Sequence, residues 1–84
     1  MAETRIGIVV KYFSKIGVAA IRLDGNLEVG DTIHIQGHTT DFNQKIDSMQ
    51  LENQTIKKAG PGDDIGIKVT DRVREHDAVY KVNP

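Results

Sequence analysis

The sequence predicts an all-β fold, a sandwich or barrel of about seven short strands. Apolar residues alternate with other residues at a period of two, as in IGIKV at residues 65–69, and this spacing is typical of strands with one buried face. No stretch sustains the apolar spacing of three and four that indicates a helix. Turn-forming residues recur between the alternating runs, for example at residues 24–26 and 60–62. Short strands at such intervals are typical of sandwiches and barrels.

Seven strands are expected along the chain. They run near Thr4–Tyr12, Ile16–Leu23, Asp31–Gln36, Phe42–Leu51, Thr55–Lys58, Asp64–Thr70 and Ala78–Val82. The first has an apolar set at alternate positions, namely Ile6, Ile8, Val10 and Tyr12. In the fourth, the alternation slips by one residue between Asp47 and Ser48, which predicts a β-bulge that bends the strand.

Size and composition restrict the function. The 84 residues predict one domain, residues 1–84, and a chain this short buries roughly 60% of its unfolded surface. With eleven basic and twelve acidic residues the net charge is −1, so binding of nucleic acid would need a local basic patch. Cysteine is absent, which excludes disulfides and thiol chemistry. No apolar run approaches the length of a membrane span, and a cytoplasmic location without a membrane partner is expected.

The glycine-rich stretch AGPGDDIGIKV at residues 59–69 is expected to be a turn and not a phosphate cradle. A P-loop needs two glycines five positions apart, the second followed by lysine and then serine or threonine. Here Gly60 and Gly66 lie six positions apart, and isoleucine follows Gly66. Similar stretches recur at residues 29–35 and 75–80, each with a turn residue, an aspartate and then a strand. The aspartates are expected to bond backbone N–H groups two residues on. No nucleotide is expected.

Catalytic and metal sites are not expected either. His34 and His38 are four residues apart, with Asp31 and Asp41 nearby. That spacing would bring two imidazoles together on a helix, but here it falls on a strand and the loop after it. No nucleophile has an evident base beside it. The chain is therefore expected to be non-enzymatic, with no cofactor and no metal.

The segment KYFSK at residues 11–15 is the candidate binding cluster. Lys11 and Lys15 flank Tyr12 and Phe13 at an expected hairpin end. The lysines can contact phosphates and an exposed aromatic ring can stack on a base. In the alternative interpretation, an aromatic side chain closes one end of the barrel and the lysines are solvated.

Three segments carry a resemblance to a known family. Gly25–Ile35 fits G-x-L-x-V-G-D-x-[IV]-x-[IV], Ile46–Gln50 fits V-x-S-[IM]-[EQ] with isoleucine first, and Ala59–Gly66 fits A-x-x-G-[DE]-[DN]-[IV]-G. Together they resemble the second domain of translational GTPases such as elongation factor Tu, over about Arg5 to Val82. Barrels at the C-terminal end of collagenase-like peptidases are also similar.

The resemblance implies a small closed Greek-key β-barrel of the translation-protein type. In the elongation factors this barrel helps to hold the 3′ end of aminoacyl-tRNA, at positions that match Gln50, Asn53 and Asp64. Those factors have Glu, Arg and Asn there, so this chain departs at all three. The change from arginine to Asn53 removes a fixed cation, and Asp64 adds a charge that repels phosphate.

Two hypotheses of function follow. In the first, the chain is a non-enzymatic, elongation factor-like module that contacts RNA, the ribosome or a translation protein. Its candidate binding residues are Lys11, Tyr12, Phe13, Lys15, Gln50 and Asn53. In the second, it is an accessory barrel for a separately encoded peptidase-like or RNA-modifying enzyme, without RNA contact.

Overall fold

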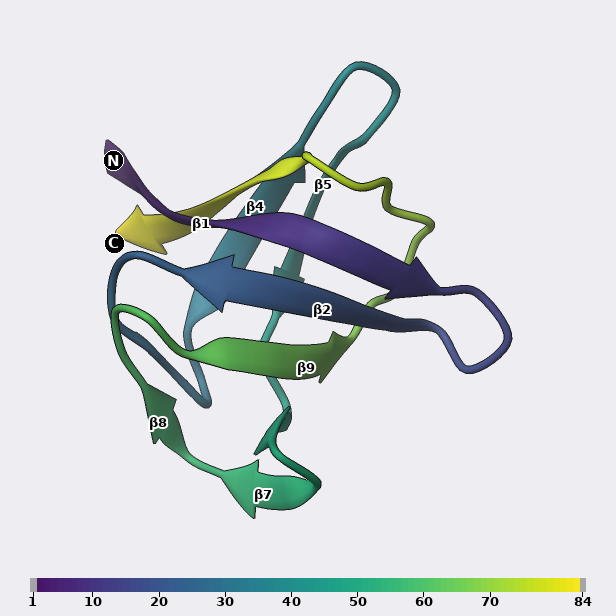
Figure 1. Cartoon of the computed structure of the whole chain (residues 1–84). Coiled ribbons are helices and arrows are strands. Elements are labelled where there is room, and N and C mark those ends of the chain that lie inside the picture. Colours follow the sequence, from purple (N-terminus) through teal and green to yellow (C-terminus); the bar gives the residue numbers. More distant parts are fainter. Residues whose placement is uncertain (1, 84) are drawn as a thin grey trace.

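The structure is a computed structural model that describes residues 2–83, and these residues form ten β-strands and no helix (Figure 1). The strands are β1 (Ala2–Phe13), β2 (Val18–Leu23), β3 (Leu27–Glu28), β4 (Thr32–Gln36), β5 (Asp41–Lys45), β6 (Met49–Leu51), β7 (Gln54–Ile56), β8 (Lys58–Ala59), β9 (Asp64–Lys68) and β10 (Ala78–Asn83). The all-β prediction is therefore confirmed. The number of strands differs because the fourth and fifth predicted strands are each divided and because the short β3 was not predicted.

Eight strands form one antiparallel sheet in the order β5-β4-β10-β1-β2-β9-β6-β7, and β3 pairs with β8 in a second, two-stranded sheet. The long β1 lies in the middle and pairs with β10 on one side and β2 on the other. Ala2 is paired with Asn83, so both ends of the described chain lie at the same side of the fold (Figure 1).

The prediction of a closed barrel is wrong. In the strand order, β5 and β7 are end strands that do not pair with each other. The expected bulge between Asp47 and Ser48 is instead a break of the strand at residues 46–48. At this break the N–H of Ile46 donates to the carbonyl of Asp31 at 2.8 Å, and its carbonyl accepts from Gly30 at 2.9 Å. Because a turn uses these backbone groups, the ladder does not continue across residues 46–48.

A side chain bridges the seam between β5 and the end of β9, two strands that do not pair with each other. Gln44 of β5 donates from Nε2 to the carbonyl of Lys68 at 2.9 Å, and its Oε1 accepts from the N–H of Thr70 at 2.9 Å. The carboxamide thus makes the donor and acceptor contacts that a neighbouring strand would make.

The core fills the inside of the curved sheet with fourteen buried apolar side chains. They are Ile6, Val9, Ala19, Ile21, Leu23, Leu27, Ile33, Ile35, Ile46, Met49, Ile65, Ile67, Val73 and Val79. In β1 the predicted alternation is broken, since Val9 is fully buried and Val10 is 37% exposed. The register of β1 shifts twice, between Arg5 and Gly7 and between Val9 and Lys11, and each shift moves the following side chains to the other face.

The recurrent glycine–aspartate stretches are three copies of one turn. The residue before each aspartate has a positive φ, which is +100° for Gly30, +89° for Gly62 and +76° for His76. In every copy the aspartate carboxylate accepts from the backbone N–H three residues earlier, namely Glu28 at 3.0 Å, Gly60 at 2.9 Å and Arg74 at 2.9 Å. The predicted turns are confirmed, but the expected bond to N–H groups two residues on is wrong. The carboxylate of Asp63 accepts from the N–H of Gly60, so this N–H is not free to bind a phosphate. The turn leads directly into β9.

Candidate functional site

The basic–aromatic cluster lies at the end of the β1–β2 hairpin, which projects from the sheet (Figure 1). Lys11 and Phe13 belong to the end of β1, and Lys15 and Ile16 to the turn that follows. Gly17 closes the turn with a φ of +66°, and its N–H donates to the carbonyl of Phe13 at 2.9 Å. Lys11, Phe13, Lys15 and Ile16 are called the hairpin tip below.

The two aromatic residues of the cluster have opposite environments. Tyr12 is partly buried and packs against the core, as the alternative interpretation predicts for one aromatic residue. Phe13 is 42% exposed, and Ile16, which sequence analysis did not select, is 62% exposed. The ammonium of Lys11 lies 5.2 Å from the centroid of the Phe13 ring, within cation–π range. The tip thus presents two apolar side chains beside two lysines.

Charge is distributed unevenly between the hairpin and the remaining chain. Residues 4–23, which span most of β1 and β2, contain four of the eleven basic residues and none of the twelve acidic ones. The remaining residues, with seven basic and twelve acidic side chains, carry a net charge of −5. The hairpin is therefore a local basic patch on an acidic domain.

Gln50 lies on the same sheet face as Lys11. The register aligns one residue from each of β1, β2, β9 and β6, namely Lys11, Ala20, Gly66 and Gln50. Directly paired residues have side chains on one face, and three strand spacings separate Lys11 from Gln50 by about 14 Å. The two residues between them are small, so no long side chain stands between Lys11 and Gln50.

Asn53 has a conformational role. Glu52 and Asn53 form the two-residue loop between β6 and β7, with φ of +51° and +67°, the signs that a type I′ turn requires. Asp64, the third position of the resemblance, pairs with Arg22 (Nε to Oδ1 2.9 Å). The hydrogen bond from Arg22 lowers the pKa of Asp64. The carboxylate of Asp64 is therefore engaged by Arg22, and Asn53 shapes a turn.

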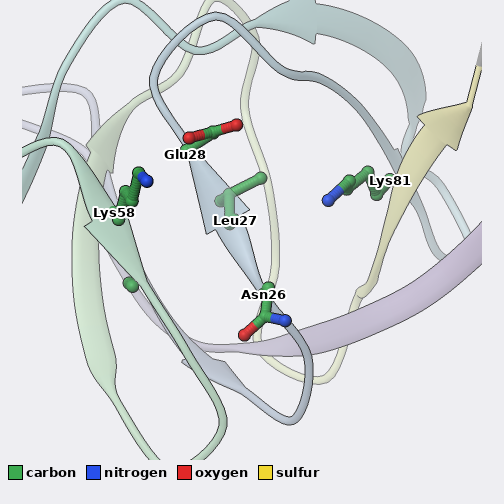
Figure 2. A pocket seen from close by; sticks show the side chains of 6 residues that line it. Asn26, Leu27, Glu28, Lys58 and Lys81 are labelled. Carbon is green, nitrogen blue, oxygen red and sulfur yellow. The ribbon is translucent and has the colours of Figure 1, made fainter.

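A hollow of about 270 Å³ lies outside the hairpin, between β3, β8 and β10 (Figure 2). Leu27 and Ala59 form its apolar part, Glu28 and Lys58 stand opposite each other across the two-stranded sheet, and Lys81 reaches in from β10. Nζ of Lys81 lies 3.6 Å from a carboxylate oxygen of Asp31. The lining has no hydroxyl, thiol or imidazole, and its ionisable groups are one carboxylate and two amines. Sequence analysis did not predict this pocket.

His34 lies on β4, as predicted, and is held between two carboxylates. Nδ1 lies 2.9 Å from Oε1 of Glu3, and Nε2 lies 2.5 Å from Oδ1 of Asp41. These bonds, the one to Glu3 first, raise the pKa of His34 above its usual value of 6.5. His38 lies in the following loop. Within residues 2–83 no group of three or more histidine, aspartate or glutamate side chains is arranged to hold a metal ion.

Comparison with known proteins gives a consistent answer. No family model matches the chain. A collagenase of Porphyromonas gingivalis is 41% identical over 81 residues, which are 94% of this chain but 22% of that protein. The solved C-terminal domain of a Geobacillus thermoleovorans protein described as a U32 peptidase has a TM-score of 0.90 at 22% identity, over 95% of this chain and 93% of that one. The chain is similar to one part of peptidases. It spans about a fifth of the curated relative's length.

The resemblance to peptidase barrels is supported, and an identity as an elongation factor domain is not. A chloroplast elongation factor Tu of Coleochaete orbicularis is 32% identical over 60 residues, or 71% of this chain and 14% of that factor. The glycine–aspartate pairs of the motifs that suggested a translation factor form turns in this structure. Among residues 2–83 there is no helix of the length and apolarity that a bilayer span requires.

Proposed function

We propose that this domain is a non-catalytic accessory module that binds another part of a peptidase-like protein. The observation that carries the proposal is the pattern of coverage: nearly the whole chain matches about a fifth of a collagenase. A unit that matches only one part of a larger peptidase is expected to assist the remaining part.

The fold comparison supports the idea of a separable module. This chain covers 93% of a solved peptidase C-terminal domain, with a TM-score of 0.90. Domains that fold alone and meet a larger body through a limited surface are common in multidomain enzymes.

The side-chain chemistry also favours a binding role. Both ring nitrogens of His34 contact carboxylates, so neither is available to take a proton from a substrate. Arg22 pairs with Asp64, and the carboxylates of Asp31, Asp63 and Asp77 accept from backbone N–H groups of their own turns. These arrangements support a non-enzymatic domain.

The translation hypothesis has weaker support. Its candidate residues were Lys11, Tyr12, Phe13, Lys15, Gln50 and Asn53, of which Tyr12 packs on the core and Asn53 shapes a turn. We keep Lys11, Phe13 and Lys15 as candidate contacts with a protein partner, and Gln50 as a further candidate on the same face.

A binding experiment in trans tests the proposal. The Porphyromonas collagenase is prepared without the segment that matches this chain, and the tagged chain is added to it. Binding should be measurable by interferometry, should survive ribonuclease and should persist at high salt, because contacts to phosphates weaken steeply with salt. A chain that binds neither the truncated collagenase nor a peptidase-like protein of its own source would contradict the accessory role.

A further inference from the structure

We propose that the hairpin tip is the docking surface of this domain and that its partner is an acidic protein surface with an apolar hollow. This inference rests on the proposed function and names the chemistry of the partner. Two features carry it: the exposure of Phe13 and Ile16, and the charge of the hairpin.

The apolar part of the tip has the form of an anchor. Single exposed apolar residues are ordinary, but here a phenylalanine, 42% exposed, and an isoleucine, 62% exposed, lie at the same hairpin end, where the N–H of Ile16 donates to the carbonyl of Phe13 at 3.3 Å. Aromatic side chains are enriched among the residues that dominate interfaces, and such anchors act best in a fully desolvated pocket. The ring of Phe13 and the side chain of Ile16 would enter the hollow of the partner.

The charged part of the tip specifies acidic groups around that hollow. Lys11 and Lys15 flank the apolar residues, and no ion pair is found for either lysine within residues 2–83. No acidic residue lies between Glu3 and Asp24 in the sequence. A ring of carboxylates on the partner would therefore meet two ammonium groups that have no carboxylate partner within residues 2–83, which steers association and fixes the orientation of binding.

Three observations favour a protein over RNA as the occupant. The ammonium of Lys11 covers one face of the Phe13 ring at 5.2 Å, the position that a stacking base would take. Ile16, the most exposed apolar side chain of the tip, has no ring for stacking. The chain outside residues 4–23 has a net charge of −5, which repels a polyanion that extends beyond the hairpin.

A backbone hydrogen bond fixes the base of the hairpin. The carbonyl of Gly17 accepts from the N–H of Val69 at 2.9 Å, so the turn is tied to the end of β9. A docking element that is already ordered loses less conformational entropy on binding.

Four variants test the proposal against the truncated collagenase. Phe13→Ser with Ile16→Ser should weaken binding at least about tenfold, as loss of central anchors does. Lys11→Glu with Lys15→Glu should slow association and reverse the effect of salt on its rate. The matched controls are Val29→Ser, which removes a 38% exposed apolar side chain elsewhere, and Lys45→Glu with Lys57→Glu. Both controls should bind like the wild-type chain, and thermal unfolding verifies that all variants are folded.

The outcomes separate this inference from the proposed function. If the wild-type chain binds and the hairpin variants bind equally well, the docking surface is wrong and the accessory role stands. If the wild-type chain binds neither the truncated collagenase nor a peptidase-like protein of its own source, both are wrong. If a single-stranded RNA oligonucleotide binds through Lys11 and Lys15 while the collagenase is bound independently of them, the protein assignment of the tip is overturned.

A second measurement does not depend on the folding of the truncated collagenase. The labelled chain is titrated by NMR with a short synthetic peptide of alternating glutamate and leucine, and with a control peptide of lysine and leucine. Shift changes at residues 11–17 with the acidic peptide alone are expected. Changes elsewhere, or equal changes with both peptides, would overturn the proposal.

Discussion

Replacing His76 with glycine should stabilise the fold, although it removes a whole side chain. His76 has a φ of +76° in the third copy of the glycine–aspartate turn, where the other two copies have Gly30 and Gly62. The left-handed conformation costs a residue with a Cβ about 1–2 kcal/mol. Glycine avoids this cost but loses about 0.5–1 kcal/mol more conformational entropy on folding. The net gain is therefore about 0.5–1 kcal/mol, or a rise in Tm of roughly 2–8 °C for a domain of this size.

The structure supplies its own controls for this prediction. His76→Ala removes the imidazole without relieving the backbone, so it should give no gain. Gly30→Ala and Gly62→Ala make the reverse change at sites where an added Cβ meets no atom within 4 Å, so each should cost about 1 kcal/mol through φ alone. Urea unfolding followed by circular dichroism measures all four free energies. A His76→Gly variant that unfolds at lower urea than the wild-type chain would refute the reasoning.

Three further changes test other parts of the fold. Gly37→Ala should cost at least about 2 kcal/mol, since the new methyl would overlap the buried carboxylate of Asp77, and an unchanged urea midpoint would contradict it. The folded-state pKa of His34 is raised above 6.5. The stabilising contribution of His34 is therefore complete below pH 6.5 and is lost as pH rises through the folded-state pKa. The free energy of unfolding of His34→Gln, measured with urea at a series of pH values, should show no such loss. Gln44→Leu should cost about 1–2 kcal/mol and speed hydrogen exchange of the Thr70 amide, and unaltered exchange would argue against the bridge.

The strands could be predicted from the sequence because alternation is a local signal, whereas the bulges could not. Val9 and Val10 are chemically identical, and only their cross-strand partners decide which one enters the core. The two register shifts of β1 compensate each other. Tyr12 therefore packs on the core like Ile6, whereas Ile8 and Val10, which share their alternation, do not. For the same reason the exposure of Phe13 depends on pairing with β2, and local sequence cannot reveal it.

The prediction of a closed barrel was wrong for a related reason. The segment at residues 42–51 has one continuous pattern, but its middle residue Ile46 bonds to the turn at Gly30 and Asp31, far away in the sequence. Such a contact competes with strand pairing and leaves no trace in the alternation. The turns were predicted correctly because glycine and aspartate act within four residues. The pocket beside Lys58 and Lys81 was missed because its walls come from strands more than twenty residues apart.

The seam and the proposed docking surface are physically linked through one short segment. Gln44 binds the carbonyl of Lys68 and the N–H of Thr70, and Val69 between them binds the carbonyl of Gly17 at the base of the hairpin. One side chain therefore holds the segment that orients the hairpin tip. Because an anchor gains affinity from being ordered before contact, an open sheet fastened by Gln44 can present the tip as firmly as a closed barrel would. It follows that Gln44→Leu should weaken binding of a partner although Gln44 itself lies outside the tip.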